Sequence, residues 1–279
     1  MKKFIQKICC NWTFAGSLIA VVVFAAISWL YFYPDAMQGK VLRQHDTLQG
    51  VANGHEVKAY EAETGETSRW TNSLFSGMPN FQINPSYSSS KLVSWIGRAY
   101  SLWFPSPVDY VFIMMLGFYI MLLAFKVRWY LAILGAIGWA FSTYFFIIIG
   151  AGHIWKYITL AYIPPTIAGI VWAYRGKYLA GGTVAALFAT LQLASNHVQM
   201  TYYFLFVIFA IVVAFLVSAI KEKKIGQWGI ATGVLAVAAI LALAANSPNL
   251  YNTYKYSKET MRGGSELKSA AADDGTSKG

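Results

Sequence analysis

The sequence predicts an all-α protein: a polytopic membrane helix bundle of about seven transmembrane helices, with a long first outer loop that contains interfacial helices. The 279 residues are 57% hydrophobic and only 12% charged, whereas soluble domains carry roughly 25% charged residues. Apolar runs of about 18–22 residues recur along the chain, and this length is enough to cross a hydrocarbon core of about 30 Å. Tyr, Phe and Trp make up 16% of the chain, which fits two aromatic belts at the membrane surfaces.

The first apolar run extends from about Phe14 to Tyr33 and follows a start that contains three lysines. This order resembles a signal peptide. The run is about 20 residues long, however, which exceeds the usual ~7–15-residue signal core, and no small-x-small cleavage site follows it. We therefore expect residues 1–33 to be a basic cytoplasmic start and an uncleaved first transmembrane helix.

Residues 34–107 form the one long polar connector of the chain, and we expect them to be an outer loop. Lys40–Tyr60 has apolar residues at roughly helical spacing, although Gly50 and Gly54 weaken the pattern. We expect this helix to lie along the membrane surface with its apolar face in lipid. Lys91–Phe104 has the aromatic composition of a second interfacial segment.

Six further apolar runs follow, and we expect them to form a six-helix transmembrane bundle over residues 108–245. Pro164-Pro165 lies inside one run, where the missing amide donors are expected to kink the helix. Gly181-Gly182 in the next run either allows close helix approach or is a plain patch of small residues. The six runs are Val108–Phe125, Trp129–Gly150, Tyr157–Tyr174, Tyr178–Ser195, Met200–Ile220 and Gln227–Ala245.

The chain turns polar after the last run. We expect residues 246–279 to be an outer polar tail that begins a further domain, with a flexible end at Ser265–Gly279, because that end is small, charged and glycine-containing.

The distribution of basic residues predicts the orientation. Ten of the 22 Lys and Arg residues fall in the N-terminal start and in three short connectors, together with one acid, Glu222. Excess positive charge marks the cytoplasmic side, so we expect the N-terminus inside and residues 34–107 outside. The formal charge of +10 is then a topology signal, and no nucleic-acid partner is needed to explain it.

This topology places all four histidines, His45, His55, His153 and His197, on the outer face. A carboxylate there can take a proton from a hydroxyl within hydrogen-bond reach. We prefer Asp46 as the catalytic candidate and name Asp35 as the second. The expected helix would direct His45, Asp46 and Gln49 towards the bundle. Each acid has an ordinary alternative as a helix cap or a solvated surface group.

The outer connectors also supply binding candidates, because cationic and histidine side chains stabilise a departing phosphate. A histidine at a helix end has the alternative of a capping or interfacial role. The substrate-binding candidates are His45, Gln49, Trp70, Asn72, His153, Lys156, Asn196, His197, Gln199 and Arg262.

The sequence predicts no cofactor and no metal site. No histidine pair has the short i, i+4 spacing, and the only thiols, Cys9 and Cys10, precede the first span. No Walker-type glycine loop is present. Use of a divalent metal stays open.

Several short motifs, in this order, resemble the YfhO family of bacterial membrane proteins. One span is followed by an outer loop with an acid motif, a Trp-Thr-Asn element and a Gly-Met-Pro turn, and further motifs lie in later connectors. The resemblance covers almost the whole chain. The motifs are Asp46-x-x-Gln49, Gly65-Glu66, Trp70-Thr71-Asn72, Gly77-Met78-Pro79, Gly152-His153-x-x-Lys156, Asn196-His197-x-Gln199 with Tyr202-Tyr203, and Ser257-Lys258-Glu259-Thr260 with Arg262-Gly263-Gly264.

That family is assigned to the GT-C glycosyltransferase superfamily. The resemblance implies a multi-pass enzyme of the bacterial cytoplasmic (inner) membrane that transfers a sugar from a polyprenyl-phosphate donor to an envelope glycan or polymer on the periplasmic or extracellular face. By residue type and position, the family's loop acid corresponds to Asp46. The GT-C pattern often has a second acid beside the first, and His45 stands there in this chain.

Two other classes stay open: a multi-pass transporter or lipid flippase, and a non-catalytic membrane scaffold. Transporters place polar groups near the bilayer midplane. The interiors of the predicted spans hold little beyond Ser142, Thr143, Gln192 and the proline pair, which favours chemistry at the outer surface.

Overall fold

The computed structural model describes residues 2–83, 87 and 90–260, and 76% of these residues are helical. The described residues form twelve α-helices, one short 3-10 helix and one two-stranded hairpin. In chain order the elements are α1 (Lys2–Tyr31), α2 (His45–Asn53), α3 (His55–Thr64), β1 (Trp70–Thr71), β2 (Met78–Pro79), η1 (Asn80–Gln82), α4 (Ser90–Tyr100), α5 (Val108–Ala124), α6 (Trp129–Ala140), α7 (Thr143–Ala151), α8 (Ile154–Tyr174), α9 (Tyr178–Ala194), α10 (Val198–Lys221), α11 (Ile225–Ala245) and α12 (Ser247–Ser257).

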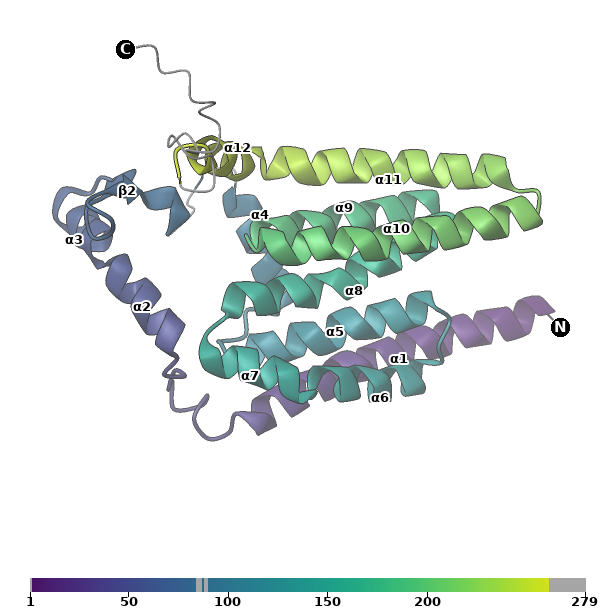
Figure 1. Cartoon of the computed structure of the whole chain (residues 1–279). Coiled ribbons are helices and arrows are strands. Elements are labelled where there is room, and N and C mark those ends of the chain that lie inside the picture. The colour runs from purple at the N-terminus through teal and green to yellow at the C-terminus, as the bar shows by residue number, and fades with distance from the viewer. Residues whose placement is uncertain (1, 84–86, 88–89, 261–279) are drawn as a thin grey trace, which may run out of the picture.

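The long helices lie side by side in a bundle, and α2, α3, α4 and α12 gather at the end away from the N-terminus (Figure 1). Four helices are long and apolar enough to cross a membrane: the Phe14–Tyr31 part of α1, α8, α10 and α11. The pair α6 and α7 makes a fifth if it is counted as one bent span. The prediction of an all-α bundle with membrane-length helices is therefore confirmed.

One predicted span is not a single helix. The run Trp129–Gly150 is divided into α6 and α7, which are bent by 46° relative to each other. At Ser142 the backbone is extended, with φ −65° and ψ 139°, so α6 ends before this residue and α7 begins after it. The prediction of one continuous helix was wrong here, because apolar composition does not report a local change of backbone conformation.

Helix α8 lies at the centre of the bundle, with 67% of its most apolar window buried. It continues through Pro164 and Pro165 without a break. A proline removes the amide that would bond the carbonyl four residues earlier. One carbonyl freed in this way, that of Ala161, faces Gly117 of α5, where an added Cβ would lie only 2.6 Å from the oxygen. The missing side chain at Gly117 thus allows α5 to approach α8 closely.

Gly169 of α8 and Gly181 of α9 allow a second close approach. A Cβ at Gly169 would lie 2.8 Å from the Gly181 carbonyl oxygen, and a Cβ at Gly181 would lie 2.7 Å from the Gly169 carbonyl oxygen. Small residues at such positions let helix backbones pack together in membranes. Of the two explanations for Gly181-Gly182, close helix approach holds for Gly181.

The outer-loop helix differs from its predicted bounds. It begins at His45 instead of Lys40, is divided at Gly54 and ends at Thr64. Gly65 adopts φ +73° after the last turn, a left-handed conformation that glycine accepts without steric cost. Apolar side chains on these helices, such as Leu48 and Val51, are about half exposed, so they do not pack on the bundle.

The polar segment after α11 is a docked helix over residues 247–257. The buried Asn246 amide donates to the carbonyls of Thr190 (3.1 Å) and Ala242 (2.9 Å). Asn252 donates to the Tyr87 hydroxyl at 3.0 Å, which ties α12 to the long loop. The expected flexible end, Ser265–Gly279, lies outside the described residues.

Candidate functional site

The N-terminus of α2 is fixed to the turn between α7 and α8. Gln44, which is 6% exposed, donates its side-chain amide to the Ile149 carbonyl and accepts a hydrogen bond from the Thr47 hydroxyl at 2.8 Å. Gly152 adopts φ +90°, and a Cβ there would lie 3.1 Å from Gln44 Cβ and 3.2 Å from Asp46 Cβ. The close approach of these two segments places Asp46 beside the start of α8.

Asp46 forms an ion pair with the residue that precedes α8. His153 Nδ1 lies 2.8 Å from Asp46 Oδ2, within ion-pair distance. His45 Nδ1 lies 3.6 Å from the other oxygen, Oδ1, which is beyond hydrogen-bond distance. The Asp46 side chain is 43% exposed, so this carboxylate is oriented on one side and open on the other.

Lys156 and His197 complete the polar wall of a hollow of about 590 Å³ between the loop helices and the bundle. Lys156 lies on α8, one turn after His153, with its ammonium 5.3 Å from the centroid of the Tyr144 ring. His197 precedes α10. The hollow therefore combines the Asp46 carboxylate of α2 with an imidazole just before α8, an ammonium on α8 and a second imidazole before α10. Lys58 and Glu61 of α3 also line it. This arrangement is able to hold an anionic group beside a base.

His197 is in its neutral form at pH 7. Its Nδ1 accepts a hydrogen bond from the Met200 amide at 3.4 Å, as the N-cap of α10. Burial lowers the pKa of His197, and the neighbouring charges of Lys156 and His153 lower it further. Because Nδ1 is an acceptor, the proton of the neutral ring is on Nε2.

Three other candidates of the loop lie outside this hollow. Asp35 is two-thirds exposed and pairs with Lys40 at 2.9 Å. The His45 side chain is 85% exposed, and Gln49 is exposed as well. The expectation that His45, Asp46 and Gln49 all point towards the bundle is correct for Asp46 and wrong for its two neighbours, because α2 turns only one face to the α7–α8 turn.

Trp70 and Asn72 belong to a small hairpin in which Trp70 pairs with Pro79. Trp70 lies over Gly77, where a Cβ would lie 2.7 Å from its indole nitrogen. The hairpin is held to α3 by Glu56, which accepts bonds from the Thr71 hydroxyl (2.5 Å) and the Asn72 amide (2.8 Å). These bonds lower the pKa of Glu56. Trp70 and Asn72 therefore serve the loop's own structure here.

The remaining candidates have other contacts. Asn196 accepts a hydrogen bond from Asn249 of α12 at 2.9 Å, and Gln199 donates to the Tyr203 hydroxyl at 3.1 Å. Neither lines the hollow around Asp46. Arg262 lies outside the described residues.

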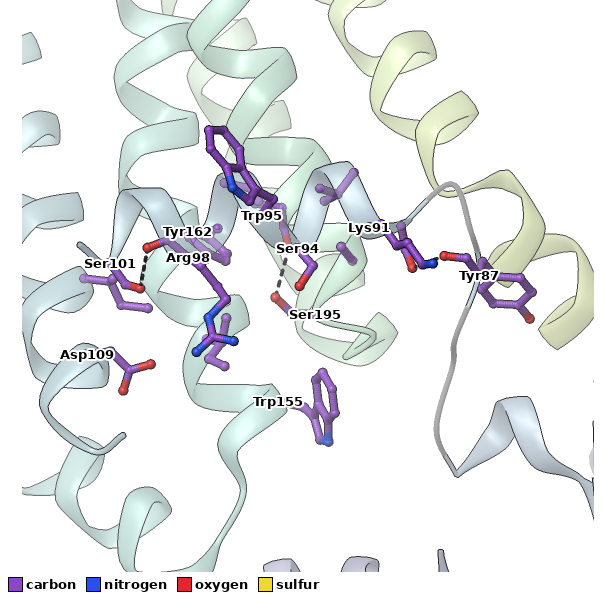
Figure 2. A pocket seen from close by; sticks show the side chains of 17 residues that line it. Tyr87, Lys91, Ser94, Trp95, Arg98, Ser101, Asp109, Trp155, Tyr162 and Ser195 are labelled. Atoms are coloured by element: carbon purple, nitrogen blue, oxygen red, sulfur yellow. Dashed lines mark hydrogen bonds between the residues drawn. The ribbon is translucent and has the colours of Figure 1, made fainter. Parts of the chain in front are cut away.

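A second hollow, of about 640 Å³, lies on the other side of Trp155 and was missed by the sequence analysis. Figure 2 shows the Arg98 guanidinium of α4 pointing between Asp109 of α5 and Trp155. Trp95, Tyr162 and several serines complete its wall. Trp155 also lines the first hollow, so the two hollows share a wall.

This second hollow contains a polar atom without a protein partner. Asp109 Oδ1 is enclosed, and the structure gives it no hydrogen bond within the described part of the chain. Buried polar groups are normally paired. A sequence signal existed: Asp109 is the only acid inside any of the seven predicted spans, and an ionisable residue within a span is a functional candidate by default.

Among the residues that the structure describes, no group of three His, Cys, Asp or Glu side chains could hold a metal ion. No family model, curated protein or solved structure matches this chain. What can be said of its function therefore depends on the sites themselves.

Proposed function

We propose that the chain is a membrane-embedded glycosyltransferase of GT-C type that transfers a sugar from a polyprenyl-phosphate donor to a cell-envelope acceptor. The observation that carries the proposal is the first hollow, in which Asp46, paired with His153, faces Lys156 and His197. The four side chains come from segments up to 151 positions apart in the sequence. They gather a base and anion-binding groups at one end of an otherwise apolar bundle.

The proposed topology has seven spans with the N-terminus in the cytoplasm. Five are α1, the pair α6–α7, α8, α10 and α11, and the other two are the apolar helices α5 and α9, of 17 residues each. At 1.5 Å per residue, 17 residues extend about 25 Å, slightly less than the hydrocarbon core of about 30 Å, and their apolar neighbours extend the span. Both hollows then open on the outer face of a bacterial inner membrane, with the loop helices at its surface.

The proposed reaction is a displacement at the anomeric carbon of the donor sugar. Asp46 accepts the proton of an acceptor hydroxyl, and the oxygen of that hydroxyl forms a bond to the anomeric carbon. The bond from this carbon to the phosphate oxygen breaks, and its electron pair leaves with the polyprenyl phosphate. Lys156 and His153 stabilise the negative charge of the departing phosphate.

The geometry around Asp46 supports this role. His153 lies 2.8 Å from Oδ2, while Oδ1 has no partner at hydrogen-bond distance in the described part of the chain. A base must lie within about 2.6–3.2 Å of the proton donor, and Oδ1 can offer this contact to an incoming hydroxyl.

The second hollow fits a hydroxylated part of the substrates. Asp109 and Arg98 offer an acceptor and donors for hydroxyl groups, and Trp95 and Trp155 offer aromatic faces for sugar rings. Asp109 is therefore the competing candidate for the base, and the test has to distinguish the two acids.

The test compares three Asp→Asn variants of the full chain in membranes, with a panel of labelled polyprenyl-phosphate monosaccharides as donors and envelope material as the acceptor. Asp46→Asn should reduce transfer by roughly 10²–10⁴-fold, the usual contribution of a general base, and should still bind polyprenyl phosphate. Asp35→Asn, a matched change in an exposed carboxylate, should leave transfer unchanged. Near-normal transfer by Asp46→Asn with loss in Asp109→Asn would move the base to the second hollow.

Transfer by the unmodified chain from none of the donors would refute the proposal. Uptake of a small solute into vesicles that contain the same protein would then favour the transporter.

A further inference from the structure

A third hollow, of about 660 Å³, lies at the opposite end of the bundle, near the N-terminus in Figure 1. Four cationic side chains line it, and they come from the three connections at this end: Lys126 between α5 and α6, Arg175 and Lys177 between α8 and α9, and Lys224 between α10 and α11. One acid, Glu222, also lines it. The hollow has no part in the proposed sugar transfer.

The single carboxylate is already neutralised. Glu222 accepts hydrogen bonds from Lys224 at 2.6 Å and from the Ser218 hydroxyl at 3.1 Å. These bonds lower the pKa of Glu222, so it is ionised at neutral pH and is paired with Lys224. Within the described part of the chain, the structure pairs none of Lys126, Arg175 and Lys177 with an acid.

One of these cations is held in place by the bundle. Arg175 donates through Nη1 to the carbonyl of Ala124, at the end of α5. A guanidinium has five N–H donors, so most of them remain for a ligand. An arginine fixed in this way is well suited to a phosphate group, which it can contact with two donors at once.

Helix ends contribute less than the side chains. Helices α5, α8 and α10 end at the hollow, and α9 and α11 begin there. A helix C-terminus carries a partial charge of about −0.5 and an N-terminus one of about +0.5. The three C-termini and two N-termini at the hollow therefore add up to a partial charge of about −0.5. Three unpaired cations outweigh this, and the hollow attracts anions.

The wall behind the cations is aromatic. Tyr174 stacks on Phe215, with ring centroids 4.7 Å apart and an interplanar angle of 14°, and it also lies parallel to Trp228 at 6.5 Å. The Trp228 indole donates to the Val212 carbonyl at 3.3 Å. Aromatic rings at such a position settle at the level of lipid headgroups.

We propose that this hollow binds the phosphate of an anionic phospholipid headgroup on the inner face of the membrane. Basic pockets between transmembrane helices on the cytoplasmic side are suited to such headgroups. A basic rim alone follows from topology, but Lys221 and Lys223 belong to the same rim and do not line the hollow. These two residues therefore provide the matched control.

The test uses the full chain in a neutral detergent and measures the binding of the first lipid molecule by native mass spectrometry. Phosphatidylglycerol is compared with phosphatidylcholine of the same acyl chains, and inorganic phosphate is added as a competitor. The unmodified chain should bind phosphatidylglycerol at least tenfold more tightly than phosphatidylcholine, and inorganic phosphate at an equal concentration should not displace it.

Each lining cation removed should weaken binding about fivefold, as expected for one basic residue near an anionic lipid surface. The double variant Lys126→Gln/Lys177→Gln should therefore bind phosphatidylglycerol about 25-fold more weakly. It leaves the hydrogen bond between Arg175 and the Ala124 carbonyl intact. The control Lys221→Gln/Lys223→Gln removes the same charge and should bind within twofold of the unmodified chain.

Three results would overturn the proposal. The lining variant could bind phosphatidylglycerol within twofold of the unmodified chain. The control variant could lose as much affinity for phosphatidylglycerol as the lining variant, which would assign the effect to the general positive charge at this end of the bundle. Inorganic phosphate could displace the lipid at an equal concentration, which would make the hollow a site for a free anion.

Discussion

Replacing Gly152 by Ala should separate α2 from the bundle and so disturb the Asp46–His153 pair. Gly152 combines two features that a side chain does not tolerate: φ is +90°, and a Cβ would lie 3.1–3.2 Å from Gln44 Cβ, Asp46 Cβ and the Thr47 amide nitrogen. Two of these atoms are Cβ atoms fixed to the backbone and the third is a backbone nitrogen, so none of them can turn away.

The expected cost follows from these two features. A positive φ costs a non-glycine residue about 1–2 kcal/mol, and overpacking a closely packed site costs about 1–3 kcal/mol. Undocking of α2 relieves only the overpacking cost, whereas the φ cost is the same in the docked and the undocked state, so we expect docking to weaken by about 1–3 kcal/mol. The Asp46–His153 pair cannot compensate, because an ion pair between half-exposed groups contributes only about 0–1 kcal/mol.

Hydrogen exchange of a peptide that covers residues 44–54 measures this docking directly. A loss of about 1–3 kcal/mol corresponds to roughly 5- to 150-fold faster exchange through local opening. The matched control is Gly150→Ala. Gly150 is helical, and its added Cβ would have no neighbour within 4 Å, so the control should leave exchange unchanged or stabilise α7 by about 0.5–1 kcal/mol.

Equal exchange in Gly152→Ala and Gly150→Ala would refute the reasoning, because it would show that the position accepts a Cβ. Faster exchange together with unchanged sugar transfer would instead separate the docking of α2 from catalysis, and Asp46 would then lose its place in the proposed reaction.

Three further predictions concern single sites. Glu56 has a lowered pKa, so its bonds to the hairpin stabilise the fold above about pH 4.5, and this stabilisation is lost as pH falls through the lowered pKa. Carbon NMR should show that Glu56 titrates at a lower pH than a free glutamate. The variant Glu56→Gln should loosen the β1–β2 hairpin at every pH. His197 also has a lowered pKa, so the stability that it contributes is complete above pH ~6.5 and falls as pH drops towards the lowered pKa. Thermal unfolding in detergent should show this loss of stability. The variant His197→Asn, which keeps a capping oxygen, should remove this pH dependence. Gly117→Ala would place a Cβ 2.6 Å from the Ala161 carbonyl oxygen and should cost about 1–3 kcal/mol, while Gly138→Ala, in open space, should not lower the melting temperature.

The positions of the long helices could be predicted closely from the sequence. Val108–Phe125 was expected where α5 covers Val108–Ala124, and Met200–Ile220 where α10 covers Val198–Lys221. This succeeds because the length and apolarity of a span are properties of a single segment. The bend at Ser142 depends on the backbone conformation of one residue, and hydropathy contains no information about it.

The grouping of Asp46, His153, Lys156 and His197 could be anticipated only as a shared membrane face. Their contact depends on Gln44, a residue without any chemical signal in the sequence, whose buried amide bonds a carbonyl 105 positions further on. Sidedness places groups on one surface, and tertiary packing decides which of them meet. This is why Asp35 and Gln49, with the same expected sidedness, lie elsewhere. The roles of all these residues stay predictions.

Asp109 was missed because a single acid hardly changes the hydropathy of an apolar run. Its position as the only acid inside a predicted span was a signal, but its neighbours are visible only in three dimensions, where Arg98 and Trp155 line the same hollow.

The distribution of polar groups through the bundle favours surface chemistry over transport. Among the described residues, no buried side chain carries a formal charge. The buried hydroxyls of Thr159 and Thr166 bond to carbonyls of their own helix, at 2.8 Å in both cases, so they have no donor left for a passing solute. Ser28 Oγ and Gln192 Nε2 are buried without a partner among the described residues, and both lie in the last turn of their helices, α1 and α9. A transporter needs polar groups that face a central site near the midplane. Among the described residues, one carboxylate oxygen of Asp46 and one of Asp109 have no hydrogen-bond partner, and both lie at the end of the bundle that carries residues 34–107. In the proposed function, a substrate that both acids recognise reacts at this end of the bundle, and this suits a lipid-linked donor, whose tail would stay in the bilayer while its sugar reaches the two hollows.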